Sequence, residues 1–236
     1  FVFYNIANAG TTEFRNYKRL IDHDYKNAMQ LFMPFYYFKG QMMQATDTVN
    51  PYGLRSYGGQ PFWFRGDQEV NHMVEQGYKV EEIVKEVLKE DYWTEQEILS
   101  NFKYELKKIE VLDRFSSFPI KEFIEENYQK VSVFVDGTHF NHLLYLYVAN
   151  QIADVLQIEQ ITNEDMLNEK KNQFSIMPVY PCVQRALNME PQSSYPFFNI
   201  KKESVEYLDI EEYIRRYTGY VMDVCNMRCK TGTDWR

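Results

Sequence analysis

The feature that most constrains the fold is an apolar segment that ends in a polar turn and passes at once into a helix. Val131-Ser-Val-Phe-Val135 is apolar and β-branched, which predicts a strand buried in the middle of a parallel sheet. Asp136-Gly-Thr-His139 follows, and an apolar helix is expected from about Asn141 to Leu156. Because ligands of open α/β sheets bind at the carboxyl ends of strands, this turn lies where a functional site is expected.

The start of the chain indicates the same alternation of strand and helix. Residues 1–6 predict a strand already in progress, a helix is expected after Thr11 or Thr12, and a second strand is expected over residues 28–37. Strand, glycine turn, helix and strand is the βαβ arrangement of a parallel sheet. We therefore predict an α/β fold in which a parallel sheet is flanked by helices.

Residues 67–128 carry a helical pattern that indicates scaffold more than chemistry. The apolar residues between Val80 and Leu88 recur at i, i+3 and i+4, which predicts one buried helix face. Thr94-Glu-Gln-Glu97 is typical of a capping box at a helix start. A length of 236 residues suffices for one core, so we assign residues 1–236 to a single α/β domain.

Residues 40–66 break this regular pattern. They hold half of the chain's 10 glycines, mixed with prolines and with the rings of Tyr52, Tyr57, Phe62, Trp63 and Phe64. A long irregular stretch inside a compact domain is usually a binding loop or lid, and clustered aromatics favour an ordered one. The alternative is a flexible insertion.

Composition and charge exclude several classes of protein. The net charge is −8 and no basic stretch is present, so we expect no nucleic-acid partner. No apolar run approaches the roughly 18 residues of a membrane span. Three cysteines, an odd number at low density, favour a reducing compartment, so we predict a cytoplasmic protein without a metal site. Aromatic residues make up 17%, and they fill the core or line a sugar-binding groove.

The polar turn contains two candidate catalytic residues. An Asp three residues before a His can accept the imidazole Nδ1–H, and Nε2 can then act as general base toward a hydroxyl or thiol. Asp136 and His139 are thus two parts of a nucleophile–His–Asp triad. In the alternative reading Asp136 only caps the helix and His139 is a packed turn residue. His142 is a second candidate base.

Two short segments resemble a known superfamily. Asp136-Gly-Thr-His139-Phe-Asn141 is similar to the last conserved block of SGNH (GDSL-type) hydrolases, which usually reads Asp-Gly-x-His-Pro-Asn. Asn5-Ile-Ala-Asn8-Ala-Gly10 resembles their second block. The resemblance implies an SGNH-hydrolase-like (flavodoxin-like) parallel sheet. It also implies an oxyanion hole to which Asn8 and the Gly10 amide contribute.

Further segments follow one another in an order that is informative over roughly residues 28 to 220. They include Met33-Pro-Phe-Tyr-Tyr-Phe-Lys-Gly40, Phe123-Ile-Glu-Glu-Asn-Tyr128, Pro178-Val-Tyr-Pro181-Cys-Val183 and Glu212-Tyr-Ile-Arg-Arg-Tyr217. Their order and spacing resemble the WcbI-type family of polysaccharide-biosynthesis acetyltransferases. The resemblance implies a coenzyme A site and transfer of an acetyl group from acetyl-coenzyme A to a saccharide hydroxyl, so the expected partner is a saccharide or polysaccharide acceptor. Coenzyme A phosphates need cations, and the candidates are Arg15, Arg19, Arg55 and Arg65.

The sequence departs from that family in two places. The family's first strand and its Gly-Asn-Cys-Gln turn, the presumed source of the nucleophile, are not found, and His139 precedes Phe140 where the family has Pro. No Ser or Cys of the chain can be assigned as nucleophile; Cys182 is expected to be a small buried residue. We expect a sheet without its first strand and a nucleophile upstream of Phe1. The alternatives are an SGNH-type esterase or deacetylase and a non-catalytic carbohydrate-binding or structural module.

Overall fold

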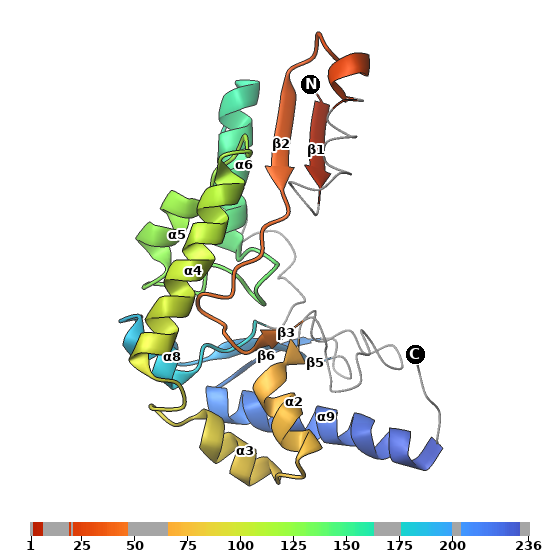
Figure 1. The fold of residues 1–236 in the computed structure, drawn as a ribbon, viewed down its shortest axis with the longest axis vertical. Coiled ribbons are helices and arrows are strands. Elements are labelled where there is room, and N and C mark those ends of the chain that lie inside the picture. Colours follow the sequence, from red (N-terminus) through yellow and green to blue (C-terminus); the bar gives the residue numbers. More distant parts are fainter. Residues whose placement is uncertain are drawn as a thin grey trace.

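The computed structural model describes residues 2–6, 19, 21–46, 66–162, 176–199 and 204–231, which form a mixed, mostly helical α/β fold. β1 (Val2–Ile6) and β2 (Gln30–Pro34) run parallel, in register from Val2 opposite Gln30 to Ile6 opposite Pro34. The pair lies at one end of the molecule, next to α6 (His142–Leu156) (Figure 1). The two N-terminal strands and their parallel pairing are therefore confirmed.

The remaining strands form antiparallel pairs. β3 (Ala45–Thr46) pairs with β4 (Gly66–Asp67), and β5 (Tyr195–Asn199) pairs with β6 (Ser204–Leu208). Within the described ranges no parallel sheet extends beyond the β1–β2 pair, so the predicted flavodoxin-like sheet flanked by helices is wrong for this part of the chain. The β3–β4 pair joins the two ends of the irregular stretch 40–66, most of which (47–65) lies outside the described residues.

The segment 131–135 is buried as predicted, but the expectation that it is a strand is wrong. Its backbone groups are bonded to a side chain where a neighbouring strand would otherwise lie. Val133 N–H donates to Oε1 of Gln41 at 2.9 Å, and Nε2 of Gln41 donates to the carbonyls of Tyr128 and Val131 at 2.7 and 2.8 Å. Buried backbone groups must be hydrogen-bonded, and one buried amide meets that need here.

The same segment folds back on itself around the polar turn. Phe134 and Phe140 form a single antiparallel bridge, and Val135 N–H donates to the carbonyl of His139 at 2.8 Å. The carbonyl of Val135 in turn accepts from Met177 N–H at 2.8 Å. The segment is thus one arm of a short hairpin whose tip is the candidate site.

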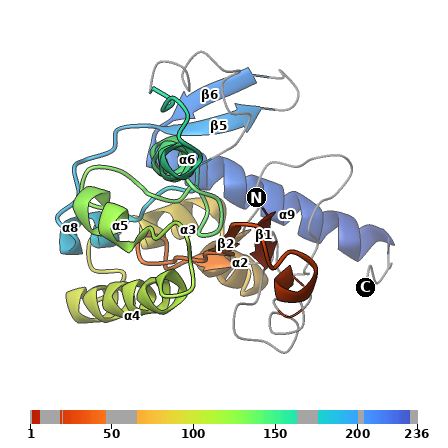
Figure 2. The ribbon, with the colours of Figure 1, turned by 90° about the horizontal axis from the view of Figure 1, so that it is seen from above.

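The predicted helical region contains α2 (Gln68–Glu75), α3 (Val80–Val87), α4 (Glu95–Asp113) and α5 (Lys121–Asn127). The expected capping box is present, since Thr94 Oγ1 accepts from Glu97 N–H and Glu97 Oε2 accepts from Thr94 N–H. α8 (Pro181–Ala186) packs against α4, and the long α9 (Ile210–Thr231) packs against α2 and α3 (Figure 1). Viewed from above, the β5–β6 pair and α4 lie on opposite sides of α6 (Figure 2).

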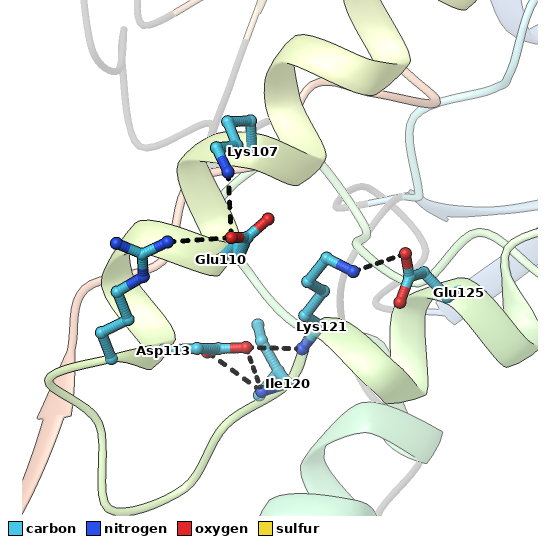
Figure 3. A network of polar contacts seen from close by, with 7 residues as sticks. Lys107, Glu110, Asp113, Ile120, Lys121 and Glu125 are labelled. Atoms are coloured by element: carbon cyan, nitrogen blue, oxygen red, sulfur yellow. Dashed lines mark hydrogen bonds and ion pairs between the residues drawn. The ribbon is translucent and has the colours of Figure 1, made fainter.

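A partly buried carboxylate links α4 to α5. Asp113, at the end of α4, accepts from the backbone N–H groups of Ile120 and Lys121, the latter at 2.8 Å (Figure 3). It also accepts from the hydroxyl of Tyr36 at 2.6 Å. α5 has no side-chain cap of its own, so Asp113 supplies the acceptor that its first turn needs. The surface ion pairs around it in Figure 3 are solvated and add little stability.

Most of the large fully buried side chains are aromatic, which supports the core reading of the aromatic composition. They include Tyr36, Phe38, Phe118, Phe134, Tyr180, Tyr195 and Tyr217. Gly40 marks the closest approach, because a Cβ there would lie 2.3 Å from the Phe38 ring. Cys182 is fully buried, as predicted.

We expect Gln41→Ala to lower the free energy of unfolding by about 1–3 kcal/mol, because it leaves the buried Val133 N–H without an acceptor. Denaturant unfolding followed by circular dichroism measures the change. Gln96→Ala is the matched control, since Gln96 is exposed on α4 and its loss should change stability by less than about 0.5 kcal/mol. Equal effects of the two substitutions would contradict the structural role of Gln41.

Candidate active site

The backbone of the hairpin tip at residues 136–139 makes a turn that requires a glycine. Gly137 has a φ of +88°, a conformation that residues with a side chain rarely adopt. Its carbonyl accepts from Phe38 N–H at 2.8 Å, which ties the tip to the chain after β2. α6 begins where the sequence predicts a helix, and the structure shows that Asn141 caps it: its side chain accepts from Leu144 N–H in the first turn and donates to the Ser132 carbonyl, each at 2.8 Å.

Asp136 and His139 are brought together at this tip. Oδ2 of Asp136 lies 2.8 Å from Nδ1 of His139. Oδ1 of Asp136 accepts at 3.0 Å from each of three donors, the N–H groups of Thr138 and His139 and the Thr138 hydroxyl. The carboxylate is therefore fixed by the backbone of its own turn, and it fixes the orientation of the imidazole.

The two side chains differ in exposure and in charge. The Asp136 side chain is 5% exposed, whereas that of His139 is 42% exposed. Burial acts to raise the pKa of Asp136. The hydrogen bond and charge of His139, with the amides of His139 and Thr138, outweigh burial and hold the pKa below its ordinary value. A buried anion thus orients an imidazole that reaches solvent, as in the His–Asp part of a triad.

The other predicted site residues are only partly within the structure. Asn8, Gly10, Arg15, Arg55 and Arg65 lie outside the described residues, so their roles stay predictions. Arg19 and His142 are both exposed, and His142 is the first residue of α6.

A cationic cluster beside the tip was missed by the sequence analysis. Lys39 Cγ lies 3.8 Å from where a Cβ on Gly137 would be. The ammonium groups of Lys39 and Lys108 lie 5.2 and 5.3 Å from the centre of the Tyr37 ring. Lys108 also pairs with both carboxylate oxygens of Glu105. Lys39 and Gly40 end the segment Met33-Pro-Phe-Tyr-Tyr-Phe-Lys-Gly40, and this pair could have pointed to the cluster. Gly40 lets the backbone approach the Phe38 ring closely.

A second titratable cluster, also missed, surrounds Asp67 at the start of α2. Oδ1 of Asp67 accepts at 3.0 Å from the N–H groups of Glu69 and Val70, and Oδ2 accepts from the Tyr180 hydroxyl at 2.7 Å. The Tyr217 hydroxyl accepts from the Asp67 N–H at 2.9 Å. Burial raises the pKa of Asp67 to about 7, although the hydrogen bonds to its carboxylate oppose the shift. The cluster is enclosed, so its role is structural.

Neither a membrane-spanning helix nor a metal site is found in the described ranges. None of the described helices combines the length and the hydropathy that a membrane crossing requires. Among the residues that the structure describes, no three His, Cys, Asp or Glu side chains gather in a way that would hold a metal ion.

Comparison with known proteins supports a fold assignment. No protein-family model matches the sequence, and no curated protein matches it either. A solved structure of WcbI, described as a novel polysaccharide biosynthesis enzyme, is similar to the chain with a TM-score of 0.61 and 13% sequence identity. The match covers 94% of this chain and 71% of that chain. The WcbI structure is of the native protein without a disulfide bond between coenzyme A and a cysteine. At this identity the likeness shows a WcbI-like fold.

We expect Gly137→Ala to lower the free energy of unfolding by about 1–2 kcal/mol and to shift the ring resonances of His139, because an L-residue strains the positive-φ turn. Gly77→Ala is the matched control, since Gly77 has a φ of +83° and nothing within 4 Å of its would-be Cβ. It should lower stability similarly and leave His139 unchanged. Unfolding experiments and NMR measure both; unshifted His139 resonances in Gly137→Ala would contradict the expected coupling.

We expect stability to fall as pH rises between about 4 and about 7, because folded Asp67 keeps a proton that the unfolded chain loses near its ordinary pKa of 3.8. Asp67→Asn keeps an oxygen for the helix cap and cannot ionise, so this part of the pH slope should disappear. Urea unfolding at about pH 5 and about pH 8 measures the slope. The same slope in wild type and variant would show that Asp67 does not hold the proton.

Proposed function

We propose that the chain is an acyltransferase that moves an acetyl group from acetyl-coenzyme A to a saccharide hydroxyl, with His139 as general base. The observation that carries the proposal is the 2.8 Å contact between the buried Asp136 carboxylate and Nδ1 of the solvent-reaching His139. The WcbI-like fold supports the choice of substrates, since WcbI is described as a polysaccharide biosynthesis enzyme and its structure is described with reference to coenzyme A.

In the proposed step, Nε2 of His139 takes the proton of the acceptor hydroxyl while its oxygen attacks the thioester carbonyl. A C–O ester bond forms and the C–S bond breaks. The imidazolium then returns the proton to the departing thiolate, so the products are the acetylated sugar and the coenzyme A thiol. Asp136 stays ionised and stabilises the imidazolium. Asn8 and the Gly10 amide remain our candidates for donors to the oxyanion. The same base would serve a covalent route through a Ser or Cys nucleophile.

The side chains beside the turn suit a phosphorylated acetyl donor. The ammonium groups of Lys39 and Lys108 lie over the Tyr37 ring, so positive charge that could bind phosphates is gathered there. Lys39 lies beside the tip, and Lys108 is paired with Glu105. Arg15, Arg19, Arg55 and Arg65 complete the candidate set. The donor, when bound, supplies the activated thioester.

We expect His139→Ala to lower acetyl transfer by about 10²–10⁴-fold, the usual contribution of a positioned general base. Asp136→Asn should also lower the rate, because it removes the anion that orients the ring. Labelled acetyl-coenzyme A incubated with a saccharide mixture measures transfer as label in the sugar fraction.

His72→Ala is the matched control, since His72 is an exposed imidazole on α2 and belongs to no candidate site. It should keep the wild-type rate. Equal rates in His139→Ala and wild type would remove His139 from the mechanism. Thiol release at the same rate with and without saccharide would instead support the esterase alternative.

A further inference from the structure

A groove between α5 and α6 lies apart from the Asp136–His139 pair and has no role so far. Its volume is about 460 Å³. Six residues of α6 line it, all on one helix face at i, i+3, i+4 spacing: Leu143, Leu146, Tyr147, Asn150, Gln151 and Asp154. The groove starts in the first turn of α6, directly after the hairpin tip. It follows the helix for about 16 Å at 1.5 Å per residue.

The half of the groove near the tip is apolar and aromatic. The rings of Phe123 from α5 and Tyr147 from α6 meet with centroids 4.8 Å apart and planes inclined at 37°. Leu143 and Leu146 complete this half. Aromatic and aliphatic surface of this kind packs against apolar C–H faces of a ligand.

The other half is polar and short of hydrogen-bond donors. Nδ2 of Asn127 donates to the Phe123 carbonyl, Nε2 of Gln151 donates to the Pro119 carbonyl, and Nε2 of Gln160 donates to Oδ1 of Asp154 at 2.7 Å. Within the described residues, no hydrogen bond reaches the side-chain oxygens of these three amides or Oδ2 of Asp154. A fitting ligand must therefore present donors, as a polyhydroxylated molecule does.

The charge around the groove argues against an anionic ligand. Asp154 lines it, and no Lys or Arg is among its lining residues. Burial raises the pKa of Tyr147, and the negative charges of Glu122, Glu126 and Asp113 raise it further. The electrostatic potential at the Tyr147 ring is therefore negative. This charge repels an anionic group such as a phosphate.

We propose that this groove binds the saccharide acceptor, with a sugar face on the Phe123 and Tyr147 rings and sugar hydroxyls donating to the oxygens of Gln151, Asp154 and Gln160. The link to catalysis rests on the proposed function, and Leu143, the first α6 residue of the groove, follows His139 by four positions in the chain. Binding itself needs no acetyl transfer. The ligand class is a neutral glycan long enough to lie along α6.

A glycan microarray probed with the labelled protein, without acetyl donor, tests the proposal, and calorimetry gives the Kd of each glycan that binds. We expect neutral glycans to bind and Tyr147→Ala to weaken the Kd at least about tenfold. The double substitution Asp154→Asn with Gln160→Ala should do the same. Both residues are exposed, so this variant should fold even if Tyr147→Ala is less stable.

Glu159→Gln is the matched control for Asp154→Asn, since it removes the same charge from an exposed residue outside the groove, and its Kd should be unchanged. An array without binding glycans overturns the proposal. So does binding confined to anionic or cationic glycans, or binding that the groove variants leave unchanged.

The groove and the proposed function fail separately. His139→Ala should keep the wild-type Kd for the glycan while losing transfer. If glycans bind in the groove and the wild type transfers no acetyl group, the glycan-binding proposal is supported and the acyltransferase proposal is rejected. If transfer occurs with an acceptor KM that the groove variants leave unchanged, the acyltransferase proposal is supported and the glycan-binding proposal is rejected.

Discussion

Within the described ranges, the buried backbone of residues 131–135 has no neighbouring strand to supply its hydrogen-bond partners, and the amide of Gln41 supplies two of them. The others come from the returning arm of the hairpin and from Met177. Because these bonds fix the arm, they also fix the tip, where Gly137 makes the turn and Asn141 starts α6. The candidate base therefore lies on a hydrogen-bonded hairpin, although the described ranges contain no wide sheet. The same hairpin also positions the groove along α6, since the helix starts where the hairpin ends.

Two buried aspartates show why a partner matters more than burial. Asp67 has backbone and tyrosine donors but, among the residues that the structure describes, no cationic partner, and burial raises its pKa to about 7. Asp136 is buried too, yet its pKa is lowered, because His139 shares its hydrogen bond and can carry a positive charge. One arrangement stores a proton inside a closed cluster. The other holds an anion behind an imidazole that solvent can reach, which is a property that general base catalysis requires.

The sequence predicted the helical region 67–128, the capping box at Thr94 and the helix after the polar turn, because periodic apolar residues and capping boxes act through local geometry. The strand over 131–135 was wrong because an apolar β-branched run signals burial, and pairing depends on Gln41, some ninety residues earlier in the chain. The β5–β6 hairpin was missed, and Pro196 within β5 is a residue that argues against a strand. Asp136 and His139 were found from their spacing and do meet. Asp67, Lys39 and the groove were missed, because each depends on contacts between distant segments.

The tautomer of His139 tests the central claim most directly, since a general base must keep Nε2 unprotonated in the neutral ring while Nδ1–H donates to Asp136. Nitrogen-detected NMR of the imidazole above its pKa reports which nitrogen carries the proton. We expect the proton on Nδ1 in the wild type. In Asp136→Ala we expect the Nδ1–H group to lose its hydrogen bond to the carboxylate. A neutral ring protonated on Nε2, or a spectrum that Asp136→Ala leaves unchanged, would contradict the assignment of Asp136 and His139 as a catalytic pair.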